Sequence, residues 1–318
     1  MNSQHFNNYR DEKMEKDKIK NVITNVVSGV LVVDKPIGLT SHDVVQIIRR
    51  GTNIRRAGHT GTLDPRASGV LVILLGPAVR LSEYVSASDK RYQATISLGS
   101  STDTFDADGT ITHTVPDVNI DEEKFNEVLQ TFVGEMEQTP PPFSAVKVHG
   151  RKAYEMAREG EEVDLAPRII KVYSLDILEW APPEAVIDVY CSSGTYVRSL
   201  ANDLGKVLGC GAYLVGLRRT KSGRFTLRDA VPLRRLKEAF DAGDWYKNLI
   251  PASEALSDWP MIELTTEQVD LIEHGHRIPA EAGSNGIVRG ISQQGDLVAL
   301  LEFVDPGEWR PKKVFFQT

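Results

Sequence analysis

The densest group of residues able to do chemistry lies in one short segment, from Gly58 to Gly69, with the sequence GHTGTLDPRASG. Its three glycines and its proline favour a rigid turn that presents Asp64 beside Arg66. Two interpretations of Asp64 are open. The carboxylate could cap the local backbone, as Asp-Pro sequences often do, or it could be an ionised nucleophile or base that a neighbouring arginine keeps charged. The residue types alone do not decide between these roles.

The sequence offers little to other kinds of active site. Its histidines are scattered, and Cys191 and Cys210 lie 19 residues apart, so no ligand spacing typical of a metal site occurs. Both cysteines have apolar neighbours, and we expect them to be buried and unreactive. Neither a phosphate-binding G-x-x-x-x-G-K-S/T loop nor a G-x-S-x-G elbow occurs. We therefore expect no metal and no cofactor.

The net charge of the whole chain argues against a nucleic-acid ligand. The sequence has 44 acidic and 37 basic side chains, a net charge of −7, whereas nucleic-acid-binding proteins are usually basic. The distribution of these charges changes the interpretation. Residues 229–318 contain 15 acidic and 9 basic side chains, a local balance of −6, so the rest of the chain is nearly neutral.

Basic side chains gather in three stretches of this nearly neutral part. One such stretch is usually a solvated surface, but three on one face would form a phosphate-binding surface that the net charge conceals. No apolar run approaches the ~20 residues that a membrane helix needs, so we expect no membrane partner. The basic residues are Arg49, Arg50, Arg55, Arg56 and Arg66 in the first stretch, Lys147, Arg151 and Lys152 in the second, and Arg198, Lys206, Arg218, Arg219, Lys221, Arg224 and Arg228 in the third.

Hydrophobic patterning predicts the elements that hold the Asp64 segment. Apolar runs over residues 29–36 and 69–76 predict two buried strands, one before the segment and one directly after Asp64 and its neighbours. Thr40 followed by Asp43 is a capping-box pattern, and the apolar face behind it predicts a helix that ends near Gly51.

Strands and helices are mixed along the rest of the chain. Residues 91–98 alternate as a half-buried strand does, with Tyr92 on the apolar face. Helices are predicted over residues 121–132 and 195–208, and two strands within residues 168–191. Because no regular β-α-β repeat appears, the pattern favours the α+β class over a doubly wound sheet.

Composition and hydrophobic patterning divide the chain into three parts. Residues 1–27 are polar and mixed in charge, and we expect a mobile extension. Residues 28–255 contain the mixed strands and helices. From residue 256 to 318 short strands alternate with Gly/Pro turns, which predicts a small β-rich domain.

A set of motifs in fixed order connects these parts. The segments are LVVDKPIGLTS, GHTGTLDPRASGVL, LGPAVRLSEYV, SDKRYQATISLG, STDTFDADG, QTPPPFSAVKVHGRKAYEMAREG, CSSGTYVRSLANDLGKVLGCGAYLVGLRR and RPKKVF. In these segments the chain resembles the TruB family of tRNA pseudouridine synthases, over most of residues 29–318. A lone GTLDP would be a weak signal, but the ordered set is highly specific.

The resemblance implies a fold, an activity and a partner. The implied fold is the α+β pseudouridine synthase fold, a mixed, largely antiparallel central sheet flanked by helices, followed by a small PUA-like RNA-binding domain. The implied activity is isomerisation of the uridine at position 55, in the T loop of tRNA, to pseudouridine without a metal or redox cofactor. The implied partner is the T arm of tRNA, and we expect a cytoplasmic monomer.

The resemblance also implies roles for individual residues. Asp64 matches the catalytic aspartate of the family, and Arg198 matches the arginine that pairs with it and keeps it ionised. Tyr92 matches the tyrosine that packs on the target base. Tyr196 and Leu217 match positions that line the uracil pocket.

Contacts with the RNA complete these expectations. His59 matches the histidine that inserts where the flipped base has left the T loop. Among the basic side chains we expect Lys147, Arg219 and Lys221 to contact the RNA. Phe143 departs from the family pattern, which usually has tyrosine there, so a hydroxyl hydrogen bond is missing at that position.

A binding protein is the alternative from a different class. An RNA-folding module that clamps the T loop would act by binding alone, and this role and catalysis do not exclude each other. The pair of Asp64 and Arg198 favours an enzyme, because binding has no need of a paired carboxylate. Two chemical routes remain open for Asp64: attack on the anomeric carbon of the sugar, or proton removal that leads to a glycal.

Overall fold

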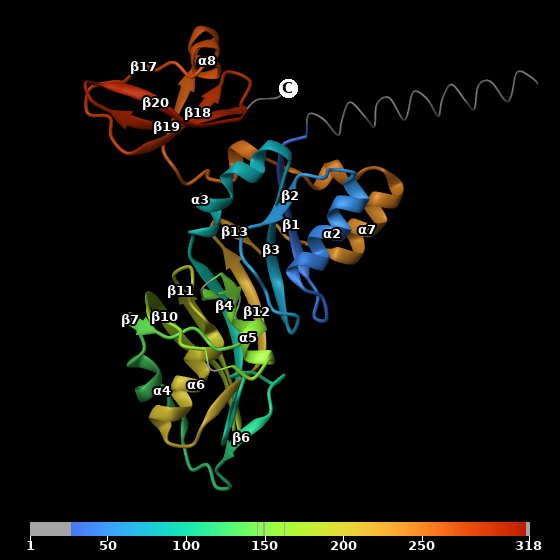
Figure 1. Ribbon diagram of the computed structural model, residues 1–318, viewed down its shortest axis with the longest axis vertical. Coiled ribbons are helices and arrows are strands. Elements are labelled where there is room, and N and C mark those ends of the chain that lie inside the picture. Colours follow the sequence, from blue (N-terminus) through green and yellow to red (C-terminus); the bar gives the residue numbers. More distant parts are fainter. Residues whose placement is uncertain (1–26, 145, 149, 162, 316–318) are drawn as a thin grey trace, which may run out of the picture.

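A large mixed sheet forms the centre of the computed structural model, which describes residues 27–144, 146–148, 150–161 and 163–315 (Figure 1). Its strands are β1 (Gly29–Lys35), β2 (Ala57–His59), β3 (Ala67–Leu75), β4 (Lys90–Leu98), β7 (Gly134–Gln138), β10 (Arg168–Ala181), β11 (Glu184–Cys191), β12 (Ala212–Ser222), β13 (Phe225–Thr226), β14 (Val231–Pro232) and β15 (Ile250–Pro251). The order along the sheet is β14-β1-β3-β12-β4-β11-β10-β7, and β2, β13 and β15 pair at its side.

Most neighbouring strands of this sheet are antiparallel, and two pairs, β1 with β14 and β12 with β3, are parallel. The parallel contact of β12 with β3 is short and joins Leu217–Arg219 to Ala67–Gly69. It brings together two segments that are distant in the sequence, one of them at the end of the loop that carries Asp64. The predicted α+β class with a largely antiparallel sheet is confirmed.

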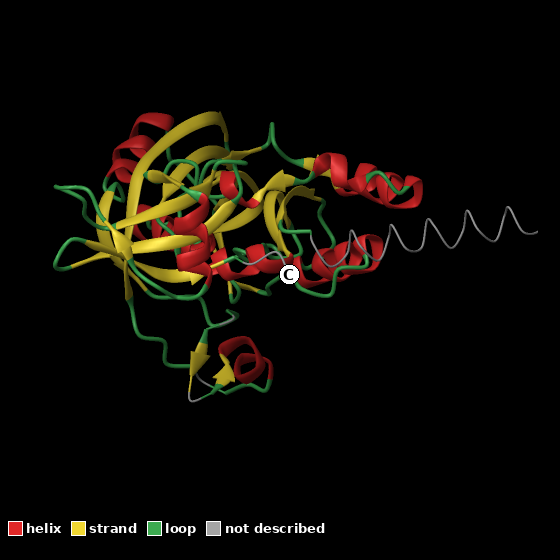
Figure 2. Ribbon diagram, turned by 90° about the horizontal axis from the view of Figure 1, so that it is seen from above, coloured by secondary structure: helices red, strands yellow, loops and turns green. Residues whose placement is uncertain are grey.

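Helices α2, α4, α6 and α7 pack on one face of the sheet, and η1 and α3 pack on the other (Figures 1 and 2). Helix α2 begins as predicted, because Thr40 and Asp43 each accept a hydrogen bond from the other's main-chain N–H. Apolar residues of α2, α4, α6 and α7 pack in one cluster with those of β1, β3, β4 and β11. The helices are α2 (Ser41–Thr52), α3 (Ser82–Ser86), α4 (Glu122–Gln130), α5 (Ala153–Arg158), α6 (Val197–Leu208) and α7 (Leu233–Ala242), with short 3-10 helices η1 (Gly76–Leu81), η2 (Trp245–Asn248) and η3 (Ala252–Glu254).

Strand β4 alternates as its sequence predicts. Tyr92 and Ala94 are buried on the side that α2, α4, α6 and α7 cover, whereas Arg91 and Gln93 are exposed. The side of Tyr92 is therefore the inner face of the sheet, and the side of Arg91 is the outer face.

A second, five-stranded sheet ends the chain and lies at the top of Figure 1. It consists of β16 (Met261–Leu264), β17 (Ile278–Pro279), β18 (Ile287–Ser292), β19 (Leu297–Val304) and β20 (Glu308–Val314), with helix α8 (Thr266–Glu273) beside it. Leu300 and Phe315 pack in one apolar cluster with Val30 and Leu81 of the central part. Two small hairpins complete the fold, β5 (Ser100–Thr102) with β6 (Ile111–Thr114) and β8 (Lys147–Val148) with β9 (Arg151–Lys152).

The predicted N-terminal extension, residues 1–27, lies outside the described residues except for Val27. Within the described ranges, no helix is both long enough and apolar enough to cross a membrane.

Lys90, the first residue of β4, is a buried cation. It is 5% exposed, and its ammonium group donates to the carbonyls of Ser86, at 2.6 Å, and Ser88. Burial, reinforced by the charge of Arg219, lowers the pKa of Lys90 from 10.5 to about 8. Between these two pH values the unfolded chain binds more protons than the folded one. This lysine therefore makes the protein more stable as the pH rises through that window.

We predict that Lys90→Met removes this pH dependence. Between about pH 8 and about pH 10, the free energy of unfolding of the wild type should rise relative to that of the variant by about 1–2 kcal/mol. Denaturant titrations of both proteins at each pH measure the difference, in which the titrating groups common to both cancel. A wild type that instead loses stability relative to the variant over this range would contradict the prediction.

Candidate active site

The loop between β2 and β3 presents Asp64 at the N-terminal end of β3, a strand in the interior of the central sheet. The main-chain N–H of Ala67 donates to the carbonyl of Asp64 at 3.0 Å, and the N–H of Gly38 donates to the carbonyl of Pro65 at 2.8 Å. The turn is thus closed by main-chain contacts. Just after the loop, Gly69, the third residue of β3, has a φ of +99°, a conformation that favours glycine.

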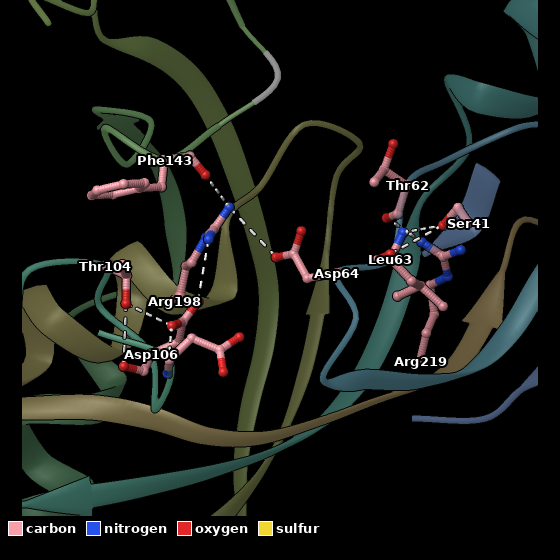
Figure 3. A network of polar contacts seen from close by, with 10 residues as sticks. Ser41, Thr62, Leu63, Asp64, Thr104, Asp106, Phe143, Arg198 and Arg219 are labelled. Atoms are coloured by element: carbon pink, nitrogen blue, oxygen red, sulfur yellow. Dashed lines mark hydrogen bonds and ion pairs between the residues drawn. The ribbon is translucent and has the colours of Figure 1, made fainter. Parts of the chain in front are cut away.

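Asp64 turns its carboxylate toward Arg198, which comes from the first turn of α6. The distance from Oδ2 of Asp64 to Nη2 of Arg198 is 3.4 Å (Figure 3). The Asp64 side chain is 48% exposed, whereas the Arg198 side chain is only 10% exposed. Among the described residues, no main-chain N–H near Asp64 donates to this carboxylate, so the geometry favours the charged, arginine-paired interpretation over the Asx turn.

Two further acceptors hold Arg198 in place. Its Nη1 lies 3.2 Å from Oδ2 of Asp106, and its Nη2 donates to the carbonyl of Phe143 at 3.0 Å. Asp106 is itself held, because its Oδ1 accepts hydrogen bonds from Oγ1 of Thr104 at 2.6 Å and from the N–H of Asp108 at 3.0 Å. One guanidinium therefore lies between two carboxylates, Asp64 and Asp106.

Asp106 is a residue that the sequence analysis did not single out. It lies within STDTFDADG, a segment that carries the family resemblance, yet nothing in that segment points to Arg198 some ninety residues later. Phe143 acts through its main-chain carbonyl. The side chain that departs from the family pattern is therefore not the part that contacts Arg198.

Tyr92 and Leu217 lie on neighbouring strands, β4 and β12, on the inner face of the sheet. Tyr92 is 8% exposed, and burial raises the pKa of its hydroxyl, against the opposing effect of the nearby Arg219 charge. On β12, Leu217 pairs with Ala94 of β4, two residues along from Tyr92 on the inner face. Because its pKa is raised, the Tyr92 hydroxyl is protonated at neutral pH.

Tyr196 immediately precedes α6 and is fixed by its main chain. Its N–H donates to Oε1 of Gln138 at 2.8 Å, and its carbonyl accepts from Nε2 of the same side chain at 3.0 Å. The Tyr196 ring centroid lies 5.9 Å from the Arg198 guanidinium carbon. The structure thus brings Asp64, Arg198, Tyr92, Tyr196 and Leu217 to one region, from a loop, a helix and two strands.

His59 lies at the end of β2, five residues before Asp64. Burial lowers the pKa of its imidazole, and the charges of Arg219 and His42 lower it further. Its Nδ1 is buried and has no hydrogen-bond partner within the described ranges. The imidazole is therefore uncharged at neutral pH.

Arg219 and Lys221 depart from the expectation of RNA contacts beside the catalytic pair. Arg219 is 2% exposed and donates to main-chain carbonyls inside the protein, so it offers no surface charge. Lys221 pairs with Arg91 on the outer face, and its Nζ lies 5.7 Å from the ring centroid of Tyr190. It is thus on the opposite face of the sheet from Tyr92. Lys147 lies in the small β8–β9 hairpin.

The two cysteines lie in the interior, as expected. Burial raises the pKa of the Cys191 thiol to about 12, so it carries no thiolate at neutral pH. In the part of the chain that the structure describes, no three histidine, cysteine or carboxylate side chains converge as a metal site would require.

Two family models match the chain in succession. The TruB family pseudouridylate synthase (N terminal domain) matches residues 49–197, and the tRNA pseudouridylate synthase B C-terminal domain matches residues 198–257. The first match contains Asp64 and Tyr92, and the second begins at Arg198. The boundary between the two matches therefore falls within the site.

Curated relatives match over most of their length. The chain is 42% identical over 288 residues to tRNA pseudouridine synthase B of Thiobacillus denitrificans, covering 91% of this chain and 96% of the relative. It is 43% identical over 289 residues to the protein of the same name from Aromatoleum aromaticum, covering 91% and 93%.

Solved structures of related fold agree with these matches. A chain of a Cbf5-Nop10-Gar1 complex superposes with a TM-score of 0.72 at 28% identity, covering 93% of this chain and 87% of that chain. A chain of an H/ACA RNP bound to a substrate RNA containing 2′-deoxyuridine gives a TM-score of 0.70 at 26% identity, with the same coverage. Together with the sequence matches along nearly the whole chain, they show that this protein belongs to the TruB family of pseudouridine synthases.

Proposed function

We propose that this protein converts the uridine at position 55, in the T loop of tRNA, to pseudouridine. The observation that carries the proposal is the contact between the half-exposed carboxylate of Asp64 and the buried guanidinium of Arg198, at 3.4 Å. The names of the relatives supply the reaction and the tRNA substrate. The T loop follows from the family resemblance of the motifs around these residues.

The reaction exchanges one bond between base and sugar for another. The bond from N1 of uracil to C1′ of ribose breaks, the base rotates, and a bond from C5 to C1′ forms; C5 loses a proton and N1 gains one. Asp64 begins either route, by attack on C1′ or by removing a proton from the sugar on the way to a glycal. Both routes need an ionised carboxylate, and Arg198 is the charged partner that orients it. We assign to Tyr92 the packing on the base that the family resemblance implies.

Access to the bond requires base flipping. A uridine stacked in a folded loop hides its sugar bond, and extruding it costs roughly a few kcal/mol. An uncharged His59 imidazole is suited to occupy the vacated stack, because a neutral aromatic ring stacks on bases without a charge to desolvate.

The remaining expectations follow as part of the same proposal. We assign catalysis to residues 28–255 and assistance in tRNA binding to the PUA-like residues 256–318, in a protein that acts as a monomer. Three basic side chains of the C-terminal part already have acidic partners: Arg310 and Lys312 contact Glu302 at 2.7 and 2.9 Å, and Lys313 contacts Glu83 at 2.8 Å. Phosphate binding there would compete with these pairs.

Asp64→Asn should abolish pseudouridine formation in a tRNA transcript and leave tRNA affinity within about tenfold of the wild type, because the amide keeps the shape but neither attacks C1′ nor accepts the proton. Chemical mapping of pseudouridine and filter binding give the two results. Normal product formation by this variant would overturn the assignment. So would a T-loop pseudouridine signal that persists in a strain from which the gene is deleted.

Asp106→Asn should slow the reaction about ten- to hundredfold with little change in tRNA affinity, because Arg198 loses a charged hydrogen-bond partner. Asp203→Asn is the matched control. Asp203 lies on α6, the helix that carries Arg198, but its carboxylate pairs with the exposed Lys206 at 3.0 Å instead of with Arg198. Single-turnover rates should separate the two variants, and equal rates would remove Asp106 from the site.

Arg55 and Arg56 are exposed just before β2 and are our candidates for phosphate contacts near His59. Replacing both by alanine should reduce the slope of log affinity against log salt by about 0.7–0.9 for each phosphate that the protein no longer neutralises. Lys221→Ala, on the outer face, tests the expectation from the sequence in the same titration. A reduced slope with Lys221→Ala alone would move the RNA to that face.

A further inference from the structure

Arg219 is a buried charge that takes no part in the proposed reaction steps. It lies in β12, is 2% exposed and is among the largest fully buried side chains of the described residues. In the described part of the chain it has no carboxylate partner. A cation in the interior is costly unless its donors are satisfied, so its position requires a reason.

Its donors are satisfied by the two arms of the loop that carries Asp64. Nη2 donates to the carbonyl of Gly61 at 3.1 Å, and Nη1 donates to the carbonyl of Thr62 at 3.3 Å, both in the arm that precedes Asp64. Nε donates to the carbonyl of Val70 at 2.7 Å, in β3 directly after the loop. One rigid guanidinium therefore ties the start of the loop to its end.

The main chain of Arg219 contacts the same loop. In the register of the sheet it lies opposite both Gly69 of β3 and Tyr92 of β4. A Cβ on Gly69 would come within 2.2 Å of the Arg219 carbonyl oxygen, so the two backbones approach as closely as only glycine allows. A side chain at position 69 would therefore push Arg219 away from the strand that follows the loop.

A second side chain holds the next residue of the loop. Oγ of Ser41, at the start of α2, accepts from the N–H of Leu63 at 2.8 Å and donates to its carbonyl at 3.1 Å. Figure 3 shows Ser41 and Arg219 on one side of the loop and Arg198 on the other, with Asp64 turned toward Arg198. Residues 61–63 are thus fixed from behind, while Asp64 itself is half exposed.

We propose that Arg219 is a positioning residue for catalysis, which holds the Asp64 loop at the distance from Arg198 that the reaction needs. The inference rests on the proposed function, since it assigns the catalytic carboxylate to Asp64. Arginine suits this task because its planar fork presents several donors in fixed directions, whereas lysine presents one compact group on a flexible stem. Displacement of a catalytic group by about 1 Å can slow a reaction about a hundredfold.

The test compares Arg219→Met and Arg219→Lys with Arg289→Met. Arg289 is a matched control: it is 7% exposed and donates to the carbonyls of Ser253, Ser257 and Trp259 at 2.8, 3.2 and 3.1 Å, but it lies in the C-terminal sheet. For each protein we would measure the melting temperature, the dissociation constant of a tRNA transcript and the single-turnover rate with tRNA saturated by enzyme.

We expect Arg219→Met to slow the single-turnover rate about a hundredfold while its tRNA affinity stays within about threefold of the wild type. Arg219→Lys should recover part of the rate. Arg289→Met should lower the melting temperature by a similar amount and keep the wild-type rate. A rate loss no greater in Arg219→Met than in Arg289→Met, or no recovery with lysine, would overturn the proposal.

A measurement independent of activity separates this inference from the proposed function. Hydrogen exchange followed by mass spectrometry should be faster in residues 59–68 of Arg219→Met than in the wild type, and unchanged there in Arg289→Met. Unchanged exchange in Arg219→Met would refute the role of Arg219. Absence of pseudouridine with the wild type would instead refute the proposed function.

Ser41→Ala extends the test if Arg219→Met does not fold. It removes the other side chain that holds the loop, at Leu63, without disturbing a buried charge. We expect faster exchange in residues 59–68 and a slower single-turnover rate, at unchanged tRNA affinity. A rate equal to that of the wild type despite faster exchange would show that the loop position does not limit catalysis and would overturn the proposal.

Discussion

The site depends on a contact between unequal partners: a carboxylate that reaches solvent, Asp64, and a guanidinium that does not, Arg198. A buried arginine is costly unless acceptors meet its charge, and Asp106 and the carbonyl of Phe143 accept from its two terminal nitrogens on the inner side. Asp64 then meets a cation that is already fixed. The carboxylate is thus held by a fixed partner on one side and remains accessible to RNA on the other.

Two buried arginines, Arg198 and Arg219, have different roles in this site. Arg198 is paired with carboxylates and faces the chemistry, whereas Arg219 is paired with carbonyls and faces the loop from behind. Carbonyl partners leave the charge of Arg219 uncompensated, and that charge lowers the pKa of both His59 and Lys90. The inner face thus combines an organised loop with a positive charge that keeps the neighbouring His59 imidazole neutral.

Local sequence patterns predicted the features that depend on residues close in the chain. They did not predict contacts between segments that are distant in the sequence. The alternation of β4 and the cap of α2 at Thr40 follow from period and spacing, and both are present. The basic stretch around Arg219 and Lys221 suggested one RNA-binding surface. However, a bulge lies between them in β12, so one side chain enters the interior and the other lies on the outer face. Asp106 needed a contact across the fold, which no spacing in the chain records.

Phe143 contributes to the site through an atom that every amino acid possesses. Since Arg198 contacts only the carbonyl at this position, that contact places no demand on the type of side chain. A different side chain at position 143 would keep this contact available, because the main-chain carbonyl remains. The phenylalanine that departs from the family pattern therefore leaves the hydrogen bond to Arg198 intact.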